Sequence, residues 1–533
     1  MADFSNLLAD LSLPENAPLV CGMMRGVEKE SLRVSGLGAL AHTPHPKALG
    51  SALTHGQITT DFSEALMEFI TPPSHQVDAV IDQLAAIHQF THLHLADEHL
   101  WPNSMPCMLG EDDSIPVAQY GSSNVGQMKT IYRLGLSQRY GRKMQTIAGI
   151  HYNFSLPSPF WAHLHSQALS NLDMQQFRTV RYFDLIRNFR RYYWLLIYLF
   201  GASPAVCGCF VSDRDHKLQR WNESGRTLYL PYATSLRMGD LGYQSNAQKS
   251  LVIDYNQLGS YLRTLCSAIS TPYPEYAELG TLGADGKPSQ LNTSLLQIEN
   301  EFYSAIRPKR TARYGETALT ALCYRGVEYI EVRCVDLNPY EPLGISREQM
   351  LLLDIFLLYC CLQPSPRTFE KEFRAVQENQ LRTVNRGREP GLKLVTTDGE
   401  KPLQQWGLEL MDAMLPVAEL LDSACGNQGY GAALALFRTY LVDPELTPSA
   451  RLLHDMREQK LEFLELTLAM AKQHSRHFQS QPQDSELLAQ MAAIAEQSLA
   501  EQADIESKDD LTFEQYLRNY YAQYDFCSRA EMS

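Results

Sequence analysis

The sequence predicts an α+β protein: a curved, mainly antiparallel sheet surrounded by helices, followed by a helical C-terminal region. Three observations support this prediction. Short segments of alternating polar and apolar residues, rich in β-branched side chains, recur between residues 25 and 339. Segments with helical periodicity lie between them, and beyond Ser346 helical periodicity dominates while strand signals fade. We therefore expect one continuous unit over residues 1–380 and a helical region over 381–533 that packs on it.

The composition and charge exclude several classes of protein. The 533 residues are 44% hydrophobic and 20% charged, which is typical of a globular chain with a large core. The formal net charge of −15 argues against nucleic acid or an anionic membrane as the main partner. The uncharged segment 192–211 is interrupted by Gly201 and Pro204, which favours a buried helix over a membrane span. The N-terminus lacks a basic and apolar leader, so we expect no signal peptide.

The cysteines indicate the redox state of the chain. The chain has 11 cysteines, an odd number, and they are spread along the sequence, unlike those of a short disulfide-rich domain. No Cys-x-x-Cys pairs with zinc-site spacing are present. We therefore expect reduced thiols and a cytoplasmic protein.

The first predicted strand covers residues 25–34. Side chains alternate between the two faces of a strand, so Glu28 and Glu30 share one face. Two carboxylates so placed repel each other unless a cation lies between them. Taken alone, this segment fits a solvated edge strand better than a site.

The second predicted strand region covers residues 58–72. Asp61 follows a β-branched run, where a loop would begin, and Glu68 lies in an apolar stretch that ends at Pro72. A carboxylate in such surroundings needs a partner. A packing helix is predicted over residues 77–95.

Two further segments carry polar residues that could meet these acids. A helix over residues 130–140 carries Tyr132 and Arg133. A strand over residues 145–157 places His151 and Asn153 on one face. A single histidine on a strand is more often structural than a metal ligand, so this strand alone decides nothing.

The segment 295–303 alternates cleanly and predicts another strand, with Glu299 and Glu301 on one face. The basic patch 307–313 follows directly. Basic clusters of this kind are usually just solvated.

The last predicted strand covers residues 326–339 and places Tyr329, Glu331 and Arg333 on one face. A carboxylate beside a guanidinium is costly to bury unless both are satisfied. Either a structural ion pair or a functional site explains this pattern.

Together, the strands place a mostly acidic row on one face of the sheet. If the strands are neighbours, the carboxylates on this concave face repel one another unless divalent cations bind between them. Mg²⁺ typically binds together with substrate phosphates. Arg133, Arg333 and the 307–313 patch would then neutralise and orient those phosphates. The sequence has neither a Walker A motif nor G-x-G-x-x-G, so a nucleotide would bind through metals and side chains.

Helices are predicted for most of the remaining chain. They are expected over residues 174–200, 255–269, 349–362, 402–421, 450–472 and 484–502.

Nine blocks of the sequence resemble one protein family. They are 25–30 (RGVEKE), 51–55 (SALTH), 58–62 (ITTDF), 101–107 (WPNSMPC), 149–155 (GIHYNFS), 230–237 (LPYATSLR), 296–301 (LQIENE), 306–310 (IRPKR) and 328–333 (EYIEVR). Together they resemble the proteobacterial type of glutamate–cysteine ligase. The resemblance is specific between residues 25 and 339 and weaker beyond about residue 380. It implies a funnel-shaped sheet distantly related to that of glutamine synthetase.

The resemblance implies a reaction and its participants. The enzyme would join the γ-carboxylate of L-glutamate to the amine of L-cysteine with ATP as co-substrate, through a γ-glutamyl phosphate, in the first step of glutathione biosynthesis. Mg²⁺, or Mn²⁺ in its place, would be the metal. The partners would be these small molecules, without nucleic acid or membrane, and the chain would be a monomer in the cytoplasm.

The resemblance also implies roles for individual residues. The implied metal ligands are Glu28, Glu30, Asp61, Glu68, His151 and Glu331. Arg133 and Arg333 would stabilise the phosphate and the transition state. The implied cysteine pocket consists of Phe62, Tyr132, Leu136, Gln145, Arg237, Tyr243 and Tyr303. Cys107 is expected to be structural or redox-sensitive, and His55 and Lys309 receive no role.

Two alternatives remain open from the sequence. One is a different carboxylate–amine ligase of the same superfamily, although Arg237 and Tyr243 suit a free α-amino acid better than a polyamine. The other is a relative that binds metal or nucleotide without turnover.

Overall fold

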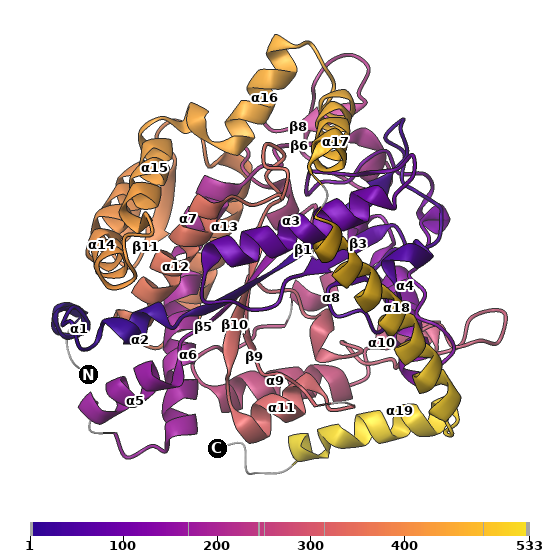
Figure 1. Cartoon of the computed structure of the whole chain (residues 1–533), viewed down its shortest axis with the longest axis horizontal. Coiled ribbons are helices and arrows are strands. Elements are labelled where there is room, and N and C mark those ends of the chain that lie inside the picture. Colours follow the sequence, from indigo (N-terminus) through magenta and orange to yellow (C-terminus); the bar gives the residue numbers. More distant parts are fainter. Residues whose placement is uncertain are drawn as a thin grey trace.

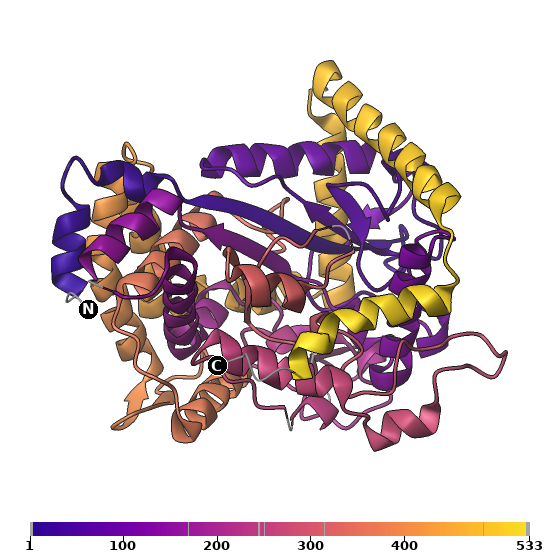
Figure 2. The same ribbon diagram turned by 90° about the horizontal axis from the view of Figure 1, so that it is seen from below.

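The structure is a computed structural model that describes residues 4–168, 170–242, 246–249, 251–313, 315–482 and 484–528. A seven-stranded sheet forms its centre (Figures 1 and 2). Its strands, in spatial order, are β2 (Ile58–Thr60), β3 (Leu66–Ile70), β1 (Met24–Val34), β5 (Ile150–Ser155), β10 (Tyr329–Val335) and β9 (Ile306–Lys309), and β4 (His99–Leu100) also pairs with β1. Every pair within this sheet is antiparallel, which confirms the predicted α+β class.

The register of the strands places the predicted polar residues in one patch. Glu30 lies opposite Glu68, and Glu28 lies opposite His151. One strand further, Glu331 lies between Asn153 on β5 and Arg307 on β9. Directly opposed residues of an antiparallel pair point to the same face, so these side chains converge.

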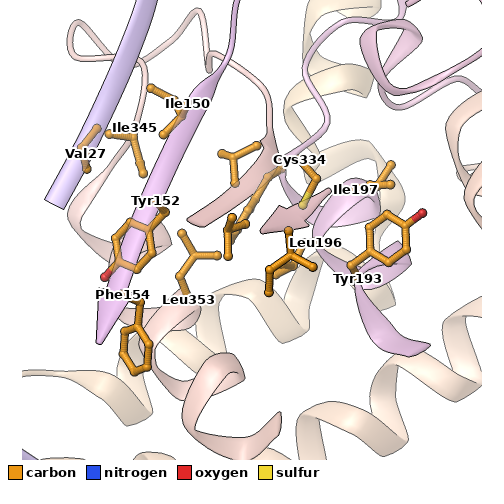
Figure 3. Close-up of a cluster of buried hydrophobic side chains, with 14 of the residues drawn as sticks. Val27, Ile150, Tyr152, Phe154, Tyr193, Leu196, Ile197, Cys334, Ile345 and Leu353 are labelled. Carbon is orange, nitrogen blue, oxygen red and sulfur yellow. The ribbon is translucent and has the colours of Figure 1, made fainter. Parts of the chain in front are cut away.

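The other face of the sheet packs on helices. These are α3 (Val77–Leu93), α6 (Met174–Tyr192), α7 (Trp194–Phe200) and α12 (Arg347–Leu362). Figure 3 shows Tyr152 of β5 beside Leu353 of α12, and Cys334 of β10 near Leu196 of α7. Each buried Leu or Ile side chain of this kind contributes about 1.5–3 kcal/mol. This core fixes the strands whose opposite face carries the acids.

The remaining elements surround the sheet. Before residue 330 the helices are α1 (Phe4–Leu11), α2 (Ala17–Cys21), α4 (Asn124–Tyr140), α5 (Ser158–Gln167), α8 (Asn246–Lys249), α9 (Leu258–Ser270), α10 (Pro274–Leu279) and α11 (Ala318–Arg325). Two small sheets are formed by β6 (Ala205–Cys207), β8 (Thr227–Tyr229) and β7 (Gln219–Arg220), and by β11 (Lys393–Thr396) and β12 (Gly399–Pro402). No helix in the described ranges is both long and apolar enough to cross a membrane.

The C-terminal part is helical, as predicted. It consists of α13 (Glu370–Arg386), α14 (Leu403–Ala424), α15 (Tyr430–Val442), α16 (Pro448–Glu458), α17 (Phe463–Ser480), α18 (Ser485–Lys508) and α19 (Phe513–Ala522). The helix predicted over residues 450–472 is two helices, because Lys460 adopts a φ of 55° that no α-helix allows. The division expected between residues 380 and 381 falls inside α13 and stays a prediction.

The strand predicted over residues 295–303 is wrong. Residues Glu299–Glu301 form a single 3₁₀ turn. The Glu301 carboxylate is paired with Arg139 at 3.0 Å and accepts a hydrogen bond from Tyr140 at 2.6 Å. Glu299 accepts hydrogen bonds from the Leu319 amide and the Tyr524 hydroxyl. Because other elements satisfy both carboxylates, neither belongs to the acidic row.

The expectation of reduced thiols is wrong for four cysteines. Cys21 is bonded to Cys425, and Cys266 is bonded to Cys527. The partners are 404 and 261 residues apart in the sequence, so their spacing gave no signal. Cys107 is a free and fully buried thiol.

A buried lysine lies on the core side of β1. The Lys29 side chain is 3% exposed, and its Nζ lies 2.9 Å from His88 Nε2. Burial lowers the pKa of Lys29 from 10.5 to about 7. The native protein therefore binds fewer protons than the unfolded chain between about pH 7 and pH 10.5. Burying the charged form destabilises the native state below pH 7, and this cost disappears as the pH rises toward 10.5.

Lys29→Met is accordingly expected to stabilise the fold. We expect the free energy of unfolding of the metal-free protein to increase by at least about 1 kcal/mol at pH 7. The gain should shrink as the pH approaches 10, because the lysine is then neutral in the native protein and begins to lose its proton in the unfolded chain as well. Urea unfolding of both proteins at pH 7 and pH 10 measures the difference. A gain that is equal at both pH values, or a loss at pH 7, would contradict the account.

Candidate active site

The polar face of the sheet lines a cleft of about 480 Å³. Its walls come from β1, β3, β5, β9 and β10, from α4, and from α19 at the other end of the chain. Thirteen of the fifteen residues predicted for the site line this cleft: Glu28, Glu30, Asp61, Phe62, Glu68, Tyr132, Arg133, Leu136, Gln145, His151, Tyr303, Glu331 and Arg333. Segments more than 300 residues apart in the sequence therefore meet at one place.

His151 lies at the centre of the acids. Its Nδ1 atom is 3.1 Å from Glu28 Oε2 and 3.6 Å from Glu331 Oε1, and its Nε2 atom is 3.5 Å from Glu30 Oε1. One ligand atom from each of Glu28, His151 and Glu331 lies within 4.8 Å of the others. Carboxylate oxygens are the ligands that Mg²⁺ prefers, and a histidine nitrogen also suits Mn²⁺.

Two of the acids are held in the ionised form. Burial works to raise the pKa of Glu331, but Lys309 at 3.1 Å and Arg333 at 3.0 Å outweigh it and hold that pKa well below its usual range. Burial also opposes ionisation of Glu28, but the hydrogen bond to His151 lowers the pKa of that carboxyl group.

The pKa values of two other acids are shifted in the opposite direction. Burial, and then the charges of Glu28 and Asp61, raise the pKa of Glu68 well above its usual range. Burial likewise raises the pKa of Glu30. Within the described part of the chain, the Glu68 carboxylate has no hydrogen bond or ion pair. A divalent cation is the partner that such a group fits, so the donor set suits Mg²⁺.

The α4 helix brings two cations to the cleft. Arg133 donates a hydrogen bond from Nε to the Asp61 carbonyl oxygen, and its guanidinium lies 4.6 Å from the centre of the Tyr120 ring. Lys129 lies one turn earlier, 5.0 Å from the same ring, and burial lowers its pKa to about 8. The aromatic ring holds both cations in place.

Only part of the predicted basic patch reaches the cleft. Arg307 and Lys309 of β9 line it, and the Arg307 guanidinium donates to the carbonyl oxygens of Asn300 and Phe302. Arg310 instead lies 3.6 Å from Glu328, which is outside the cleft lining. Lys309, to which the sequence assigned no role, forms an ion pair with Glu331.

The predicted cysteine pocket is partly assembled. Tyr303 donates a 2.9 Å hydrogen bond to Gln145 Oε1, and both line the cleft with Phe62. Arg237 is buried, donates to the Arg333 carbonyl oxygen at 2.8 Å, and lines a neighbouring cavity of about 210 Å³ that shares Tyr303 and Arg333 with the cleft. Tyr243 lies outside the described residues, so its role stays a prediction.

Two residues without a predicted function have structural surroundings. His55 Nδ1 accepts hydrogen bonds from the amides of Gln57 and Ile58, which fixes the turn before β2. Burial raises the pKa of Cys107, which fits a structural thiol.

Sequence reasoning missed nine residues that line the cleft. They are Val125, Met128, Lys129, Ile298, Asn300, Gly315, Glu316, Tyr516 and Tyr520. Lys129 immediately precedes the helix predicted over residues 130–140 and lies four residues before Arg133, so extending that helix by one residue would have placed both cations on a shared face. The tyrosines gave no such signal, because nothing in the sequence brings α19 to the sheet.

Comparison with known proteins gives the family. The family model described as glutamate–cysteine ligase matches residues 8–383. The glutamate–cysteine ligase of Saccharophagus degradans is 53% identical over 528 residues, 99% of both chains. That of Pseudomonas aeruginosa is 48% identical over 97% of this chain and 98% of its own. The crystal structure of glutamate–cysteine ligase from Francisella tularensis in complex with AMP matches with a TM-score of 0.89 and 36% identity, over 95% of this chain and 98% of that one. The chain therefore belongs to the glutamate–cysteine ligase family of enzymes.

Proposed function

We propose that this ligase forms γ-glutamylcysteine from L-glutamate, L-cysteine and ATP through a γ-glutamyl phosphate, as the first step of glutathione biosynthesis. A glutamate γ-carboxylate oxygen attacks the γ-phosphorus of ATP, and ADP leaves. The cysteine amine then attacks the acyl carbon, the phosphate leaves, and the amine proton passes to solvent. The observation that carries the proposal is the row of carboxylates that lines one cleft together with Arg133, Arg307 and Arg333.

The acidic row supports a role in metal binding. Glu28, Glu68, His151 and Glu331 would hold Mg²⁺ or Mn²⁺, with Glu30 and Asp61 beside them. Bound there, the metal would neutralise the negative charge of the phosphates during transfer. Arg333 and Arg133 would contact the transferred phosphoryl group with fixed guanidinium donors.

The pocket around Tyr303 supports the choice of acceptor. Phe62, Tyr132 and Leu136 offer aromatic and apolar walls to a small thiol side chain. Arg237 and Tyr243 would bind the acceptor carboxylate. We propose a monomer, and the use of ATP supports a cytoplasmic location.

Phosphate release by the purified protein tests this function. With MgATP, we expect phosphate only when glutamate and an amine acceptor are both present. Cysteine and 2-aminobutyrate should act as acceptors, and simple amines should act poorly, because they lack the carboxylate. EDTA should abolish release, and excess Mg²⁺ should restore it. Phosphate release that is independent of the acceptor would refute the proposal, and a preference for simple amines would favour a different ligase of the superfamily.

A further inference from the structure

The helix α19 forms one wall of the substrate cleft, although it lies more than 100 residues beyond the region that the family model matches. We propose that Tyr516 and Tyr520 of this helix form the binding surface for the purine base of the nucleotide. The inference rests on the proposed use of ATP. It assigns a ligand to the α19 wall of the cleft, for which the sequence offered no function.

The position of α19 follows from an apolar cluster. Met128 and Ile131 of α4 pack with Leu291 and Ile298, and α19 covers them. The covering side chains are Phe513, Tyr516, Leu517, Tyr520 and Tyr521. In Figure 2, α19 (yellow) runs below the strands, on the opposite side of the sheet from α3. This places the helix on the side of the acidic face.

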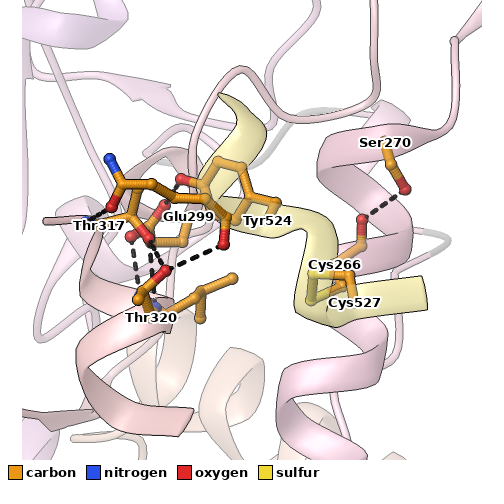
Figure 4. Close-up of a disulfide and its surroundings, with 9 residues drawn as sticks. Cys266, Ser270, Glu299, Thr317, Thr320, Tyr524 and Cys527 are labelled. Atoms are coloured by element: carbon orange, nitrogen blue, oxygen red, sulfur yellow. Dashed lines mark hydrogen bonds between the residues drawn. A yellow bond between two sulfur atoms is a disulfide. The ribbon is translucent and has the colours of Figure 1, made fainter. Parts of the chain in front are cut away.

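Polar contacts and a disulfide fix the end of α19 and the segment after it. Tyr521 donates to the Gln297 carbonyl oxygen at 2.9 Å, and Tyr524 donates to Glu299 Oε2 at 2.5 Å. Cys527 is bonded to Cys266 of α9 (Figure 4). Glu299 therefore anchors the C-terminal segment instead of joining the acidic row. A wall held in this way is preorganised to bind a rigid ligand.

The α4 residues that line the cleft change from apolar to cationic along the helix. Val125 and Met128 of its first turns are apolar and line the cleft, and Met128 packs against α19. Lys129 and Arg133 follow, and Leu136 lies beyond them. From Val125 to Arg133 the helix rises about 12 Å, roughly the reach from the base to the terminal phosphate of an extended nucleoside triphosphate.

The α19 end of the cleft suits a flat aromatic ligand. Aromatic side chains bind nucleotide bases by stacking, and Tyr516 and Tyr520 supply two rings there. Asn300 lines the same cleft and carries the amide group that can pair with an adenine edge. Glutamate and cysteine have no flat face to stack, and their expected positions lie at the acids and around Tyr303. The base of the nucleotide is the substrate part that fits this wall.

Paired substitutions at the two tyrosines test the assignment. Tyr520→Phe and Tyr516→Phe keep the ring, whereas Tyr520→Leu and Tyr516→Leu fill a similar space without it. We expect each Leu variant to raise the KM for ATP about tenfold and to weaken binding of the magnesium complex of AMP-PNP, a non-hydrolysable ATP analogue, by a similar factor in calorimetry. The Phe variants should stay within about twofold of wild type, and so should the KM values for glutamate and cysteine.

Arg518→Ala is the matched control on the same helix. The Arg518 side chain is 70% exposed and pairs with Glu514 on its own helix, so its loss should leave all three KM values unchanged. The base assignment is overturned if the Leu variants keep the wild-type KM for ATP, or if the KM for cysteine rises instead. Failure of the proposed function would appear differently, as a wild-type enzyme without ATP-dependent ligation.

Discussion

Glu331→Gln is expected to lower kcat at least about tenfold. Glu331 is 1% exposed, faces Lys309 and Arg333, and is one of three residues whose ligand atoms come within 4.8 Å of each other. The amide keeps the size of the side chain but removes its charge. A metal bound there would lose a ligand, and Lys309 and Arg333 would lose the anion that pairs with them.

Glu328→Gln is the matched control for this change. Glu328 lies three residues earlier in the chain, is partly exposed, and pairs with Arg310 outside the cleft. Its amide variant should keep wild-type kcat. Steady-state assays of both variants at saturating substrates make the comparison. Equal activities of the Glu331 and Glu328 variants would show that the acidic row does not take part in the reaction.

Arg333→Ala is expected to lower kcat by about 10²–10³, the scale of losing one charge-stabilising donor. Arg333 NH1 lies 3.0 Å from Glu331 and 3.4 Å from His151, so its guanidinium is fixed beside the acids. Arg333→Lys should recover only part of this loss, because an ammonium group keeps the charge but not the planar fork of donors.

Single-turnover experiments separate this effect from binding. We expect slower formation of ADP in the first turnover, with little change in the KM for glutamate. Arg310→Ala is the control and should be active, because Arg310 directly follows β9, the strand next to β10, but is outside the cleft lining. A rise in KM at normal kcat would mean that Arg333 binds substrate equally in the ground and transition states.

The acidic face could be predicted because strand alternation is a local property. Glu28 and Glu30 share a face two residues apart, and so do Glu331 and Arg333. The buried alternate positions, such as Val27 and Val332, carry the apolar half of the pattern. The motif blocks then gave the family, which local periodicity alone could not give.

The strand prediction for residues 295–303 failed because of contacts with residues distant in the sequence. Residues 295–303 alternate like a strand, yet Glu301 is satisfied by Arg139 and Tyr140 of α4. A segment whose carboxylate is bound by another element can form a turn instead of a strand. The alternating pattern of the segment does not reveal that partner. The pairing of Cys266 with Cys527 was hidden in the same way.

Binding of Mn²⁺ to the purified protein, followed by electron paramagnetic resonance, tests the central claim most directly. The claim is that Glu28, Glu68, His151 and Glu331 converge in a space too small for their charges without a divalent cation. We predict at least one Mn²⁺ bound per chain, with affinity reduced about tenfold or more in Glu68→Gln and Glu331→Gln and unchanged in Glu328→Gln. Wild-type protein that binds no Mn²⁺, or amide variants that bind it as tightly as wild type, would contradict the account.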